Sequence, residues 1–364
     1  MPQQCLDDEL IEDKLAAQHY TGEQIAQIMP KLKEIDDLRR DKNALILAHY
    51  YQILPIQLIA DIRGDSLKLA MAAREIRDKQ LIVSSTVHFM AEMVKLLNQK
   101  IKVVIPDLTA SCSIAEGING EALRAIRKSF PSAAIIGYIN TTAESKAEMD
   151  SVCTSTNAAL VAQSISGSPI ILLPDYNLSK NVLIPLAEIN PRQTYLAYKE
   201  MENGSLVLED VSKGELHRVR TGRFSLPIRD KGTCEVHERF TRGEVEHWKE
   251  QHNIDEVLSH PEVNPDVAAI SDMVGGTKNM IDYVGLSPSK RFLVITECDL
   301  LAALREAYPD REFITPCYLC QYMKKNTLDN LTNSLRNEVY EIKLDERTAE
   351  GARRSLERMF ELTQ

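Results

Sequence analysis

The chain has 364 residues, of which 44% are apolar and 26% charged, and its formal net charge is −10 at pH 7. This length allows two or three domains with a buried core. The negative charge and the absence of a basic run argue against a nucleic acid partner. No apolar stretch approaches the ~20 residues that span a bilayer, and the acidic N-terminus is unlike a secretory signal. We therefore expect a cytoplasmic protein without nucleic acid or membrane partners.

Residues 1–40 are expected to form a helical arm, because apolar side chains recur there at helical spacing. Short apolar bursts then alternate with amphipathic stretches. The bursts are nearly continuous and rich in Ile, Leu and Val, which is typical of strands buried on both faces of a parallel sheet. They occupy residues 44–48, 81–83, 102–105, 134–138, 169–173, 268–270, 292–295 and 312–314. The alternation predicts an α/β fold.

A strand–helix–strand pattern that ends in proline and cysteine occurs at residues 81–112 and again at 292–320. A third strand ends in Pro-Asp within residues 170–177, and Cys234 lies further on. The repetition favours similar α/β domains that each deliver a cysteine to a shared centre, although many doubly wound proteins show such echoes. Residues 191–232 break the alternation of strand-like and helical segments. They contain β-like pieces around a Gly-containing turn, which predicts an inserted hairpin or flap.

Seven cysteines in a reducing compartment indicate metal binding or catalysis rather than a disulfide framework. Three of them are interpreted as tail, core or helix-cap residues, namely Cys5, Cys153 and Cys298. Four follow strand-like segments, where open α/β sheets bind ligands, namely Cys112, Cys234, Cys317 and Cys320.

The pair Cys317 and Cys320, taken alone, fits a redox pair, half of a zinc site or no function. Zinc normally takes a second closely spaced pair of ligands, and none is visible. Thiolates hold iron–sulfur clusters, and a cluster with three protein ligands keeps an iron that acts as a Lewis acid. The cysteine spacing leaves these alternatives open.

Eight motifs in a fixed order carry a resemblance to a known family: ILAHYYQ (46–52), GDSLKLA (64–70), VHFMAE (87–92), YINTTAESKA (138–147), CTSTNA (153–158), CEVHERF (234–240), HPEV (260–263) and CQYMKK (320–325). Together they resemble quinolinate synthase, from about residue 30 to the C-terminus. The resemblance implies an enzyme of NAD biosynthesis that condenses iminoaspartate (iminosuccinate) with dihydroxyacetone phosphate and releases phosphate and water. It also implies an aspartate-oxidising enzyme that supplies the iminoaspartate through transient contact.

The resemblance also implies three similar α/β/α domains with short parallel sheets, arranged around a pseudo-threefold axis with the active site at the centre. In this chain the domains would be residues 41–118, 119–234 (including the insertion 191–232) and 235–335, with the segment 336–364 packing back on the first. Each domain would give one ligand to a [4Fe–4S] cluster, namely Cys112, Cys234 and Cys320. Cys317 is then either a bystander or the partner of Cys320 in a regulatory disulfide.

By motif position, the resemblance assigns substrate binding to His49, Ser66, Tyr138, Ile139, Asn140, Ser155, His260, Pro261, Glu262 and Thr277. It assigns proton transfer to Tyr51, Glu262 and His237. Tyrosine, histidine and glutamate suit a reaction with several proton transfers. Ser66 lies in a turn that enters a helix, where backbone N–H groups bind anions. Without the family, His49 would be interpreted as a core histidine and Ser66 as a helix N-cap.

This chain departs from the family pattern at two places. Gly276 stands where the family commonly has serine, so a hydroxyl is missing although Thr277 is retained. In addition, Cys234 follows Cys112 by 122 positions and Cys320 follows Cys234 by 86, whereas compact relatives have two similar gaps. The excess falls in residues 191–232, where Asp-Lys-Gly at 230–232 replaces the Trp-Pro-Gly often found there.

Two other functions stay open on the sequence. One is a different [4Fe–4S]-dependent hydro-lyase that uses the same open iron, and the other is a cluster-based redox sensor that needs neither Tyr51 nor Glu262. A structural zinc protein is a more distant alternative.

Overall fold

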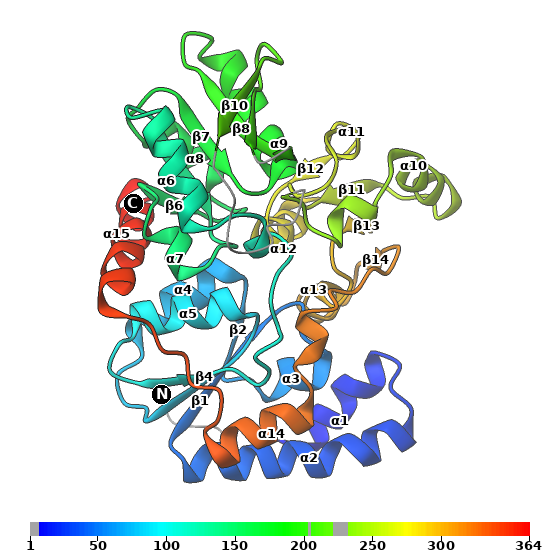
Figure 1. The fold of residues 1–364 in the computed structure, drawn as a ribbon. Coiled ribbons are helices and arrows are strands. Elements are labelled where there is room, and N and C mark those ends of the chain that lie inside the picture. Colours follow the sequence, from blue (N-terminus) through cyan, green and yellow to red (C-terminus); the bar gives the residue numbers. More distant parts are fainter. Residues whose placement is uncertain (1–6, 203–204, 221–231) are drawn as a thin grey trace. The chain divides into compact units, whose positions relative to one another are not determined.

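The computed structural model describes residues 7–202, 205–220 and 232–364 (Figure 1). Cys5 and, in the predicted insertion, residues 203–204 and 221–231 therefore lie outside the described residues. The chain forms two compact units. Unit 1 holds the residues before Cys112 together with 298–306 and 319–343, and unit 2 holds 112–297, 307–318 and 344–364. Among the described residues, no helix has the length and apolarity needed to cross a membrane.

Unit 1 contains a parallel sheet of four strands in the order β2-β1-β3-β4. Its strands are β1 (Ala44–His49), β2 (Ile62–Gly64), β3 (Leu81–Ser85) and β4 (Lys102–Val104). Its helices are α1 (Asp8–Ala17), α2 (Gly22–Asp41), α3 (Leu54–Ile59), α4 (Ser66–Glu75), α5 (His88–Leu97) and α14 (Leu328–Asn337), with the short turn η3 (Met323–Lys325) before α14. The predicted N-terminal arm corresponds to α1 and α2, whose apolar side chains join one core with β1, β3 and α14.

The second sheet belongs to unit 2 and has the order β10-β9-β8-β7-β5-β6. Its strands are β5 (Ala134–Tyr138), β6 (Ser151–Cys153), β7 (Ile170–Leu173), β8 (Tyr195–Glu202), β9 (Ser205–Asp210) and β10 (Leu216–Arg220). The associated helices are η1 (Ala115–Gly117), α6 (Gly120–Ser129), α7 (Ala143–Lys146), α8 (Ala158–Ser164), α9 (Tyr176–Ile189) and α15 (Glu346–Leu362). Strands β5 to β8 pair in parallel, whereas β9 and β10 are antiparallel additions at the edge.

The third sheet, also in unit 2, is parallel with the order β12-β11-β13-β14. Its strands are β11 (Glu256–Ser259), β12 (Met273–Val274), β13 (Arg291–Ile295) and β14 (Glu312–Ile314). Its helices are η2 (His237–Arg239), α10 (Arg242–Gln251), α11 (Pro265–Ala268) and α12 (Thr277–Leu286), and α13 (Leu300–Ala307) follows β13.

The three sheets share one four-stranded parallel unit, in which the first strand lies between the second and third, and the fourth lies outside the third. The unit reads β2-β1-β3-β4, β6-β5-β7-β8 and β12-β11-β13-β14. The first strands are buried along nearly their whole length, and the continuous apolar runs at 44–48 and 134–138 predict two of them. The run expected as a strand at 268–270 instead lies at the end of α11, and β11, with the sequence EVLS, is not a continuous apolar run. The predicted α/β class with several short parallel sheets is therefore confirmed.

In each of the three four-stranded units, an aspartate that precedes the second strand forms two hydrogen bonds with one residue of the first strand. Its carboxylate accepts the N–H of a first-strand residue, and its own backbone N–H donates to the carbonyl of that residue. The pairs are Asp61 with Ile46 (2.8 Å), Asp150 with Ile135 (2.7 Å) and Asp272 with Val257 (2.7 Å). This shared contact gives a common reference for residues that occupy equivalent positions in the three units.

Two segments differ from their expected placement. The predicted insertion includes β8, but β8 pairs in parallel with β7 and is the fourth strand of the shared unit, so the described additions are β9 and β10. The C-terminal segment was expected on the first α/β domain. Its residues up to 343 lie beside β4, where the N–H of Ile342 donates to the carbonyl of Val103, but α15 packs on α7 and β6 of the second sheet.

Candidate active site

Most predicted substrate residues fall at three equivalent positions of the repeated unit. The first position comes three residues after the first-strand residue that pairs with the aspartate, and it holds His49, Tyr138 and His260. The second comes two residues later and holds Tyr51, Asn140 and Glu262. The third comes five residues after that aspartate and holds Ser66, Ser155 and Thr277. All nine lie at or just after the carboxyl end of a parallel strand, which is where open α/β sheets place ligands. Ile139 and Pro261 lie between the first two positions.

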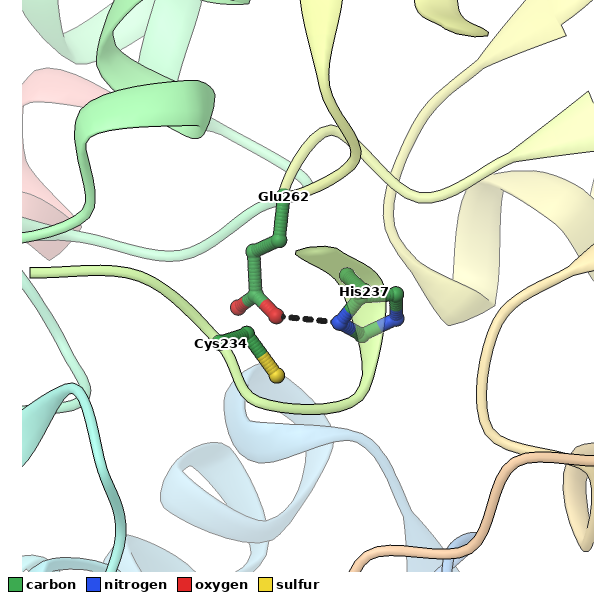
Figure 2. Close-up of side chains that lie close together, drawn as sticks. All are labelled: Cys234, His237 and Glu262. Carbon is green, nitrogen blue, oxygen red and sulfur yellow. Dashed lines mark ion pairs between the residues drawn. The ribbon is translucent and has the colours of Figure 1, made fainter. Parts of the chain in front are cut away.

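Glu262 is the centre of a buried polar cluster in unit 2. Its Oε1 accepts the Tyr138 hydroxyl at 2.5 Å, and its Oε2 lies 2.6 Å from His237 Nδ1, as Figure 2 shows for the histidine. His260 Nδ1 lies 3.5 Å from the same Oε2. The rings of His237 and His260 stack with their centroids 4.4 Å apart. All four side chains are buried, so this part of unit 2 brings together residues that the motifs assigned to substrate binding and proton transfer.

The charge state of Glu262 follows from this environment. Burial opposes ionisation, but the positive charges of His260 and His237, with hydrogen bonds from His237 and Tyr138, lower the pKa of Glu262 to about 2. The carboxylate is therefore charged at neutral pH. A carboxylate with so low a pKa is a weak base, and it suits the orientation of neighbouring donors better than proton abstraction by itself.

His237, the first residue of η2, has partners at both ring nitrogens. Its Nδ1 faces Glu262, and its Nε2 lies 2.8 Å from the hydroxyl oxygen of Thr296, which directly follows β13. Thr296 is fully buried and is not among the residues that the motifs single out. A carboxylate on one side and a hydroxyl on the other fix the plane of the imidazole, as in other acid–base pairs.

Asp175 is a second carboxyl group of this region that the motifs do not single out. It is fully buried at the N-terminus of α9, where its side chain accepts the N–H of Leu178 at 2.6 Å. Burial, and after it the charge of Glu262, raises the pKa of Asp175 well above its usual range. The pKa values of two neighbouring carboxyl groups are thus displaced in opposite directions, a pattern typical of active sites. The Pro-Asp strand end at residues 170–177 is its only sequence signal.

The start of α12 presents a buried hydroxyl. Thr277 is 3% exposed, and its hydroxyl oxygen has no hydrogen-bond partner among the described residues. A Cβ added at Gly276 would lie 2.6 Å from the hydroxyl oxygens of Ser155 and Thr156, so a serine at this position would collide with them. The backbone N–H of Gly276 donates to Asn279 Oδ1 at 3.0 Å. Hydroxyls at a helix N-terminus suit an anion, and here Ser155 and Thr156 occupy the space of the family serine.

The predicted residues of unit 1 lie after β1 and at the start of α4. His49 Nδ1 accepts the N–H of Tyr51 at 3.1 Å, and their rings meet edge to face with centroids 4.5 Å apart. Gln57 donates to two carbonyls of this loop at 2.8 Å, and Lys324 donates to the carbonyl of Tyr51. Ser66 is the first residue of α4, but the N-cap is the preceding aspartate, so Ser66 does not cap the helix.

The three predicted ligand cysteines are each followed by the same turn. The carbonyl of the cysteine accepts the N–H of the residue four positions later, at 3.1, 3.0 and 3.2 Å in chain order. A 3₁₀ turn begins three residues after the cysteine, and the N-cap of a helix comes seven residues after it. The N-caps are Asn119, Thr241 and Thr327. Cys112, Cys234 and Cys320 are therefore locally equivalent, which their irregular spacing in the sequence hides.

Exposure separates the three predicted ligand cysteines from Cys153. Cys112, Cys234 and Cys320 are reduced and partly exposed. Cys153 is also reduced but fully buried, and burial raises the pKa of its thiol far above the usual range. Cys317 is disulfide-bonded, as is Cys298, which differs from the interpretation of Cys298 as a core or cap residue. Because Cys320 is reduced, the structure has no disulfide between the two cysteines of the CxxC motif.

Within unit 2, Ser113 joins the turn of Cys112 to the turn of Cys234. Its hydroxyl donates to the carbonyl of Thr233 at 3.3 Å and accepts the N–H of Glu235 at 3.4 Å. These two residues flank Cys234, and Ser113 directly follows Cys112. The hydroxyl therefore holds the two turns together.

Cys234 also belongs to a second group of ligand-type side chains. Its sulfur and one atom each of His237 and Glu262 all lie within 4.8 Å of one another (Figure 2). A thiolate, an imidazole and a carboxylate are ligands that a single zinc or iron ion accepts. Unit 2 thus offers either a site for a single ion or one part of a larger cluster site.

These features define an α/β enzyme whose polar groups lie at or just after the carboxyl ends of parallel strands and whose partly exposed, reduced cysteines each precede the same kind of turn. The model of one family, described as quinolinate synthetase A protein, matches residues 33–361. Quinolinate synthase 1 of Mesorhizobium japonicum is 39% identical over 325 residues, 89% of each chain. The quinolinate synthases of Agrobacterium fabrum (37% over 350 residues, 93% of this chain and 90% of the relative) and Caldicellulosiruptor saccharolyticus (36% over 333 residues, 91% and 98%) are also similar.

The chain belongs to the quinolinate synthase family, and its function is that of a quinolinate synthase in NAD biosynthesis. The resemblance of the eight motifs is thereby confirmed. The family is iron–sulfur dependent.

Proposed function

We propose that the chain condenses iminoaspartate with dihydroxyacetone phosphate to quinolinate, with release of phosphate and water, and that Cys112, Cys234 and Cys320 hold a [4Fe–4S] cluster. The turn shared by these three reduced, partly exposed cysteines carries the proposal. Cys153 lacks that turn, and its burial disfavours the thiolate form, so Cys153 is not among the proposed ligands. The bound cluster supplies an iron with an open position that acts as a Lewis acid.

His237 and Glu262 are the proposed acid–base pair of unit 2. The charged carboxylate orients His237 so that Nδ1–H donates to Glu262, and Nε2 is therefore the nitrogen proposed to exchange a proton. The hydroxyl of Thr296 lies next to this nitrogen. The negative charge of Glu262 orients the imidazole of His237 and stabilises its protonated form. The Tyr138 hydroxyl donates to the other carboxylate oxygen of Glu262. Tyr51 is the proposed proton donor of unit 1.

The hydroxyls and imidazoles that follow the strands are the proposed anion binders. Iminoaspartate has two carboxylates and dihydroxyacetone phosphate has a phosphate, so the reaction requires several donor groups. Thr277 and Ser155 present hydroxyls at the N-terminus of α12. The remaining donors come from His49, Ser66, Tyr138, Asn140 and His260. Ile139 and Pro261 are proposed to contact the substrate without donating, because the Ile139 N–H binds the carbonyl of Cys153 and proline has no N–H. An aspartate-oxidising enzyme is the proposed source of the imine, which hydrolyses readily in water.

The test is anaerobic purification followed by measurement of iron, sulfide and quinolinate. We expect about four irons and four sulfides per chain, and quinolinate from iminoaspartate and dihydroxyacetone phosphate. Single alanine variants of Cys112, Cys234 and Cys320 should lose both cluster and product. Cys153→Ala is the matched control and should keep both. A full cluster without quinolinate would favour another hydro-lyase or a redox sensor.

The group Cys234, His237 and Glu262 favours one competing assignment, a site for a single metal ion. In that case the protein would bind about one metal ion per chain without sulfide, and Glu262→Gln would lower metal content. Cluster binding instead predicts that Glu262→Gln keeps iron and sulfide and loses turnover. The two measurements on this one variant separate the assignments.

A further inference from the structure

Helix α9 holds the backbone on both sides of Glu262. Asn181 Nδ2 donates to the carbonyl of Pro261 at 2.9 Å and to that of Val263 at 2.8 Å. Asn177 Nδ2, one helical turn earlier, lies 3.3 Å from the carbonyl of Glu262. An amide group has two N–H donors, and Asn181 uses both on the loop. Three successive carbonyls of the loop are therefore held from one face of α9.

The same loop continues to the turn that carries His237. Asn264 Nδ2 donates to the carbonyls of Glu238 at 3.2 Å and Phe240 at 3.3 Å, which follow His237 in the chain. Asn177 also lies 3.5 Å from Asn264 Oδ1. A displacement of α9 would thus move Glu262 and, through Asn264, disturb the turn of its histidine partner.

The adjoining face of α9 is bound to the inserted strand β9. Glu209 on β9 accepts the hydroxyl of Tyr176 at 2.6 Å and the ammonium of Lys180 at 3.1 Å. Lys180 also donates to the Tyr176 hydroxyl at 3.2 Å. The Glu209 side chain is only 12% exposed, so solvent screens these contacts little. Tyr176 and Lys180 each directly precede one of the two asparagines that hold the loop.

We propose that the insertion braces the catalytic loop through α9. Glu209 holds the first turns of the helix through Tyr176 and Lys180. Asn177 and Asn181, on the same turns of the helix, hold the loop of residues 260–264 through their hydrogen bonds to its carbonyls. These are positioning residues, because they act through Glu262 and His237. The proposal rests on the proposed role of Glu262, and it explains why strands outside the four-stranded unit adjoin a helix of the active site.

The position of the loop matters because Glu262 and His237 must be placed accurately to transfer protons. Reacting groups must be held to within a fraction of an ångström, and a misplacement of about 1 Å costs up to 100-fold in rate. The loop of residues 260–264 is short and irregular, so its backbone lacks the restraint of a strand or helix. Side-chain donors from α9 supply that restraint.

The experiment compares Asn181→Ala with Asn190→Ala, the same change at the exposed end of the same helix. Hydrogen exchange of the peptide covering residues 257–268, without substrate, reports the loop independently of turnover. We expect exchange at residues 260–264 to be at least tenfold faster in Asn181→Ala and unchanged in Asn190→Ala. We also expect kcat to fall about tenfold or more, with KM within twofold and with iron and sulfide unchanged.

The insertion itself is tested by Glu209→Gln, with Glu215→Gln on the same insertion as its control. Glu209→Gln keeps the size of the side chain but weakens its bond to Lys180. We expect faster exchange in the loop and a smaller loss of kcat than in Asn181→Ala. This variant leaves both asparagines in place, so it also tests the brace if Asn181→Ala does not fold.

Equal exchange in the loop for Asn181→Ala and Asn190→Ala, or for Glu209→Gln and Glu215→Gln, would overturn the brace. A lower melting temperature with unchanged loop exchange and kcat would do the same, because it would reveal a purely structural role. If the parent chain makes no quinolinate, the proposed function fails, but faster loop exchange in the two variants would still support the brace.

Discussion

Tyr138 and Glu262 join two sheets of unit 2 through one hydrogen bond. Tyr138 ends β5, Glu262 follows β11, and the tyrosine hydroxyl donates to the carboxylate at 2.5 Å. The two residues are 124 positions apart in the sequence. The bond therefore exists only after both α/β units have formed and packed together.

Replacement of Tyr138 by phenylalanine removes this bond without changing the ring. Hydrogen bonds to charged groups contribute about 1.5–3 kcal/mol, so we expect kcat/KM to fall by roughly 10- to 100-fold. Steady-state kinetics of the reconstituted enzyme measure the effect. Tyr308→Phe is the matched control, because its hydroxyl donates to the carbonyl of Ile281 instead. Comparable activity losses in the two variants would count against a special role for Tyr138.

Replacement of Thr277 by valine should separate substrate binding from stability. The native hydroxyl is buried without a partner among the described residues, which costs about 1–3 kcal/mol. We expect Thr277→Val to be as stable as the parent chain or more stable in urea, while KM rises about tenfold. Thr332→Val removes a hydroxyl that donates to the carbonyl of Leu328 and should leave KM unchanged. An unchanged KM in Thr277→Val would remove Thr277 from the substrate site.

Restoring the family serine at Gly276 should harm this protein. The added side chain would meet Ser155 and Thr156 at its Cβ, so we expect a loss of about 1–3 kcal/mol in unfolding free energy and a higher KM. Gly243→Ser places the same atoms where no atom lies within 4 Å and should be tolerated. Urea unfolding and steady-state kinetics of both variants check this, and an improved KM in Gly276→Ser would show that the site adjusts.

The pH dependence of stability should report Glu262. Its pKa in the folded chain is about 2, below the ordinary value of 4.5, so its contribution is fully present above that value and is lost as the pH falls toward 2. We expect the stability difference between the parent chain and Glu262→Gln to be constant above about pH 5 and to shrink between pH 4.5 and 2. Urea unfolding across this range measures the difference, and a constant difference would contradict the lowered pKa.

Asp175 should show the opposite dependence. Its pKa is raised by burial and by the charge of Glu262, so its contribution is present at low pH and is lost as the pH rises toward the raised pKa. Asp175→Asn keeps the cap of α9 and cannot ionise. We expect this variant to gain stability relative to the parent chain between pH 4 and 8, and to keep its activity if the neutral carboxyl is the working form. A relative loss over that range would show that Asp175 is charged.

Local pattern in the sequence predicts many of the strands and several sites. Continuous apolar runs mark β1 and β5 but not β11, whose sequence EVLS begins and ends with polar residues. The motifs place His49, Tyr138 and His260 directly at or after strand ends. The family resemblance, which the comparisons confirm, rests on the same motifs. The exact fourth strand of the second sheet is less visible, because β8 pairs with β7 on one side and with the inserted β9 on the other. One segment therefore carries features of both the core unit and the insertion.

Side-chain partners far apart in the chain are beyond such patterns. Asn181 and Glu209 are ordinary polar residues in the sequence, and only the packing of α9 between β9 and the loop of Glu262 gives them partners. The same holds for Gly276, whose missing side chain is explained by hydroxyls about 120 positions earlier.

The class of fold, the family and the residue types of the site can be predicted from the sequence, because apolar periodicity and short motifs act over a few neighbouring residues. The charge of each buried carboxyl group, the packing of α15 and the contacts between the insertion and α9 become visible only in the folded chain. Those properties depend on burial and on contacts between residues distant in the chain, and both arise only when the sheets and helices come together.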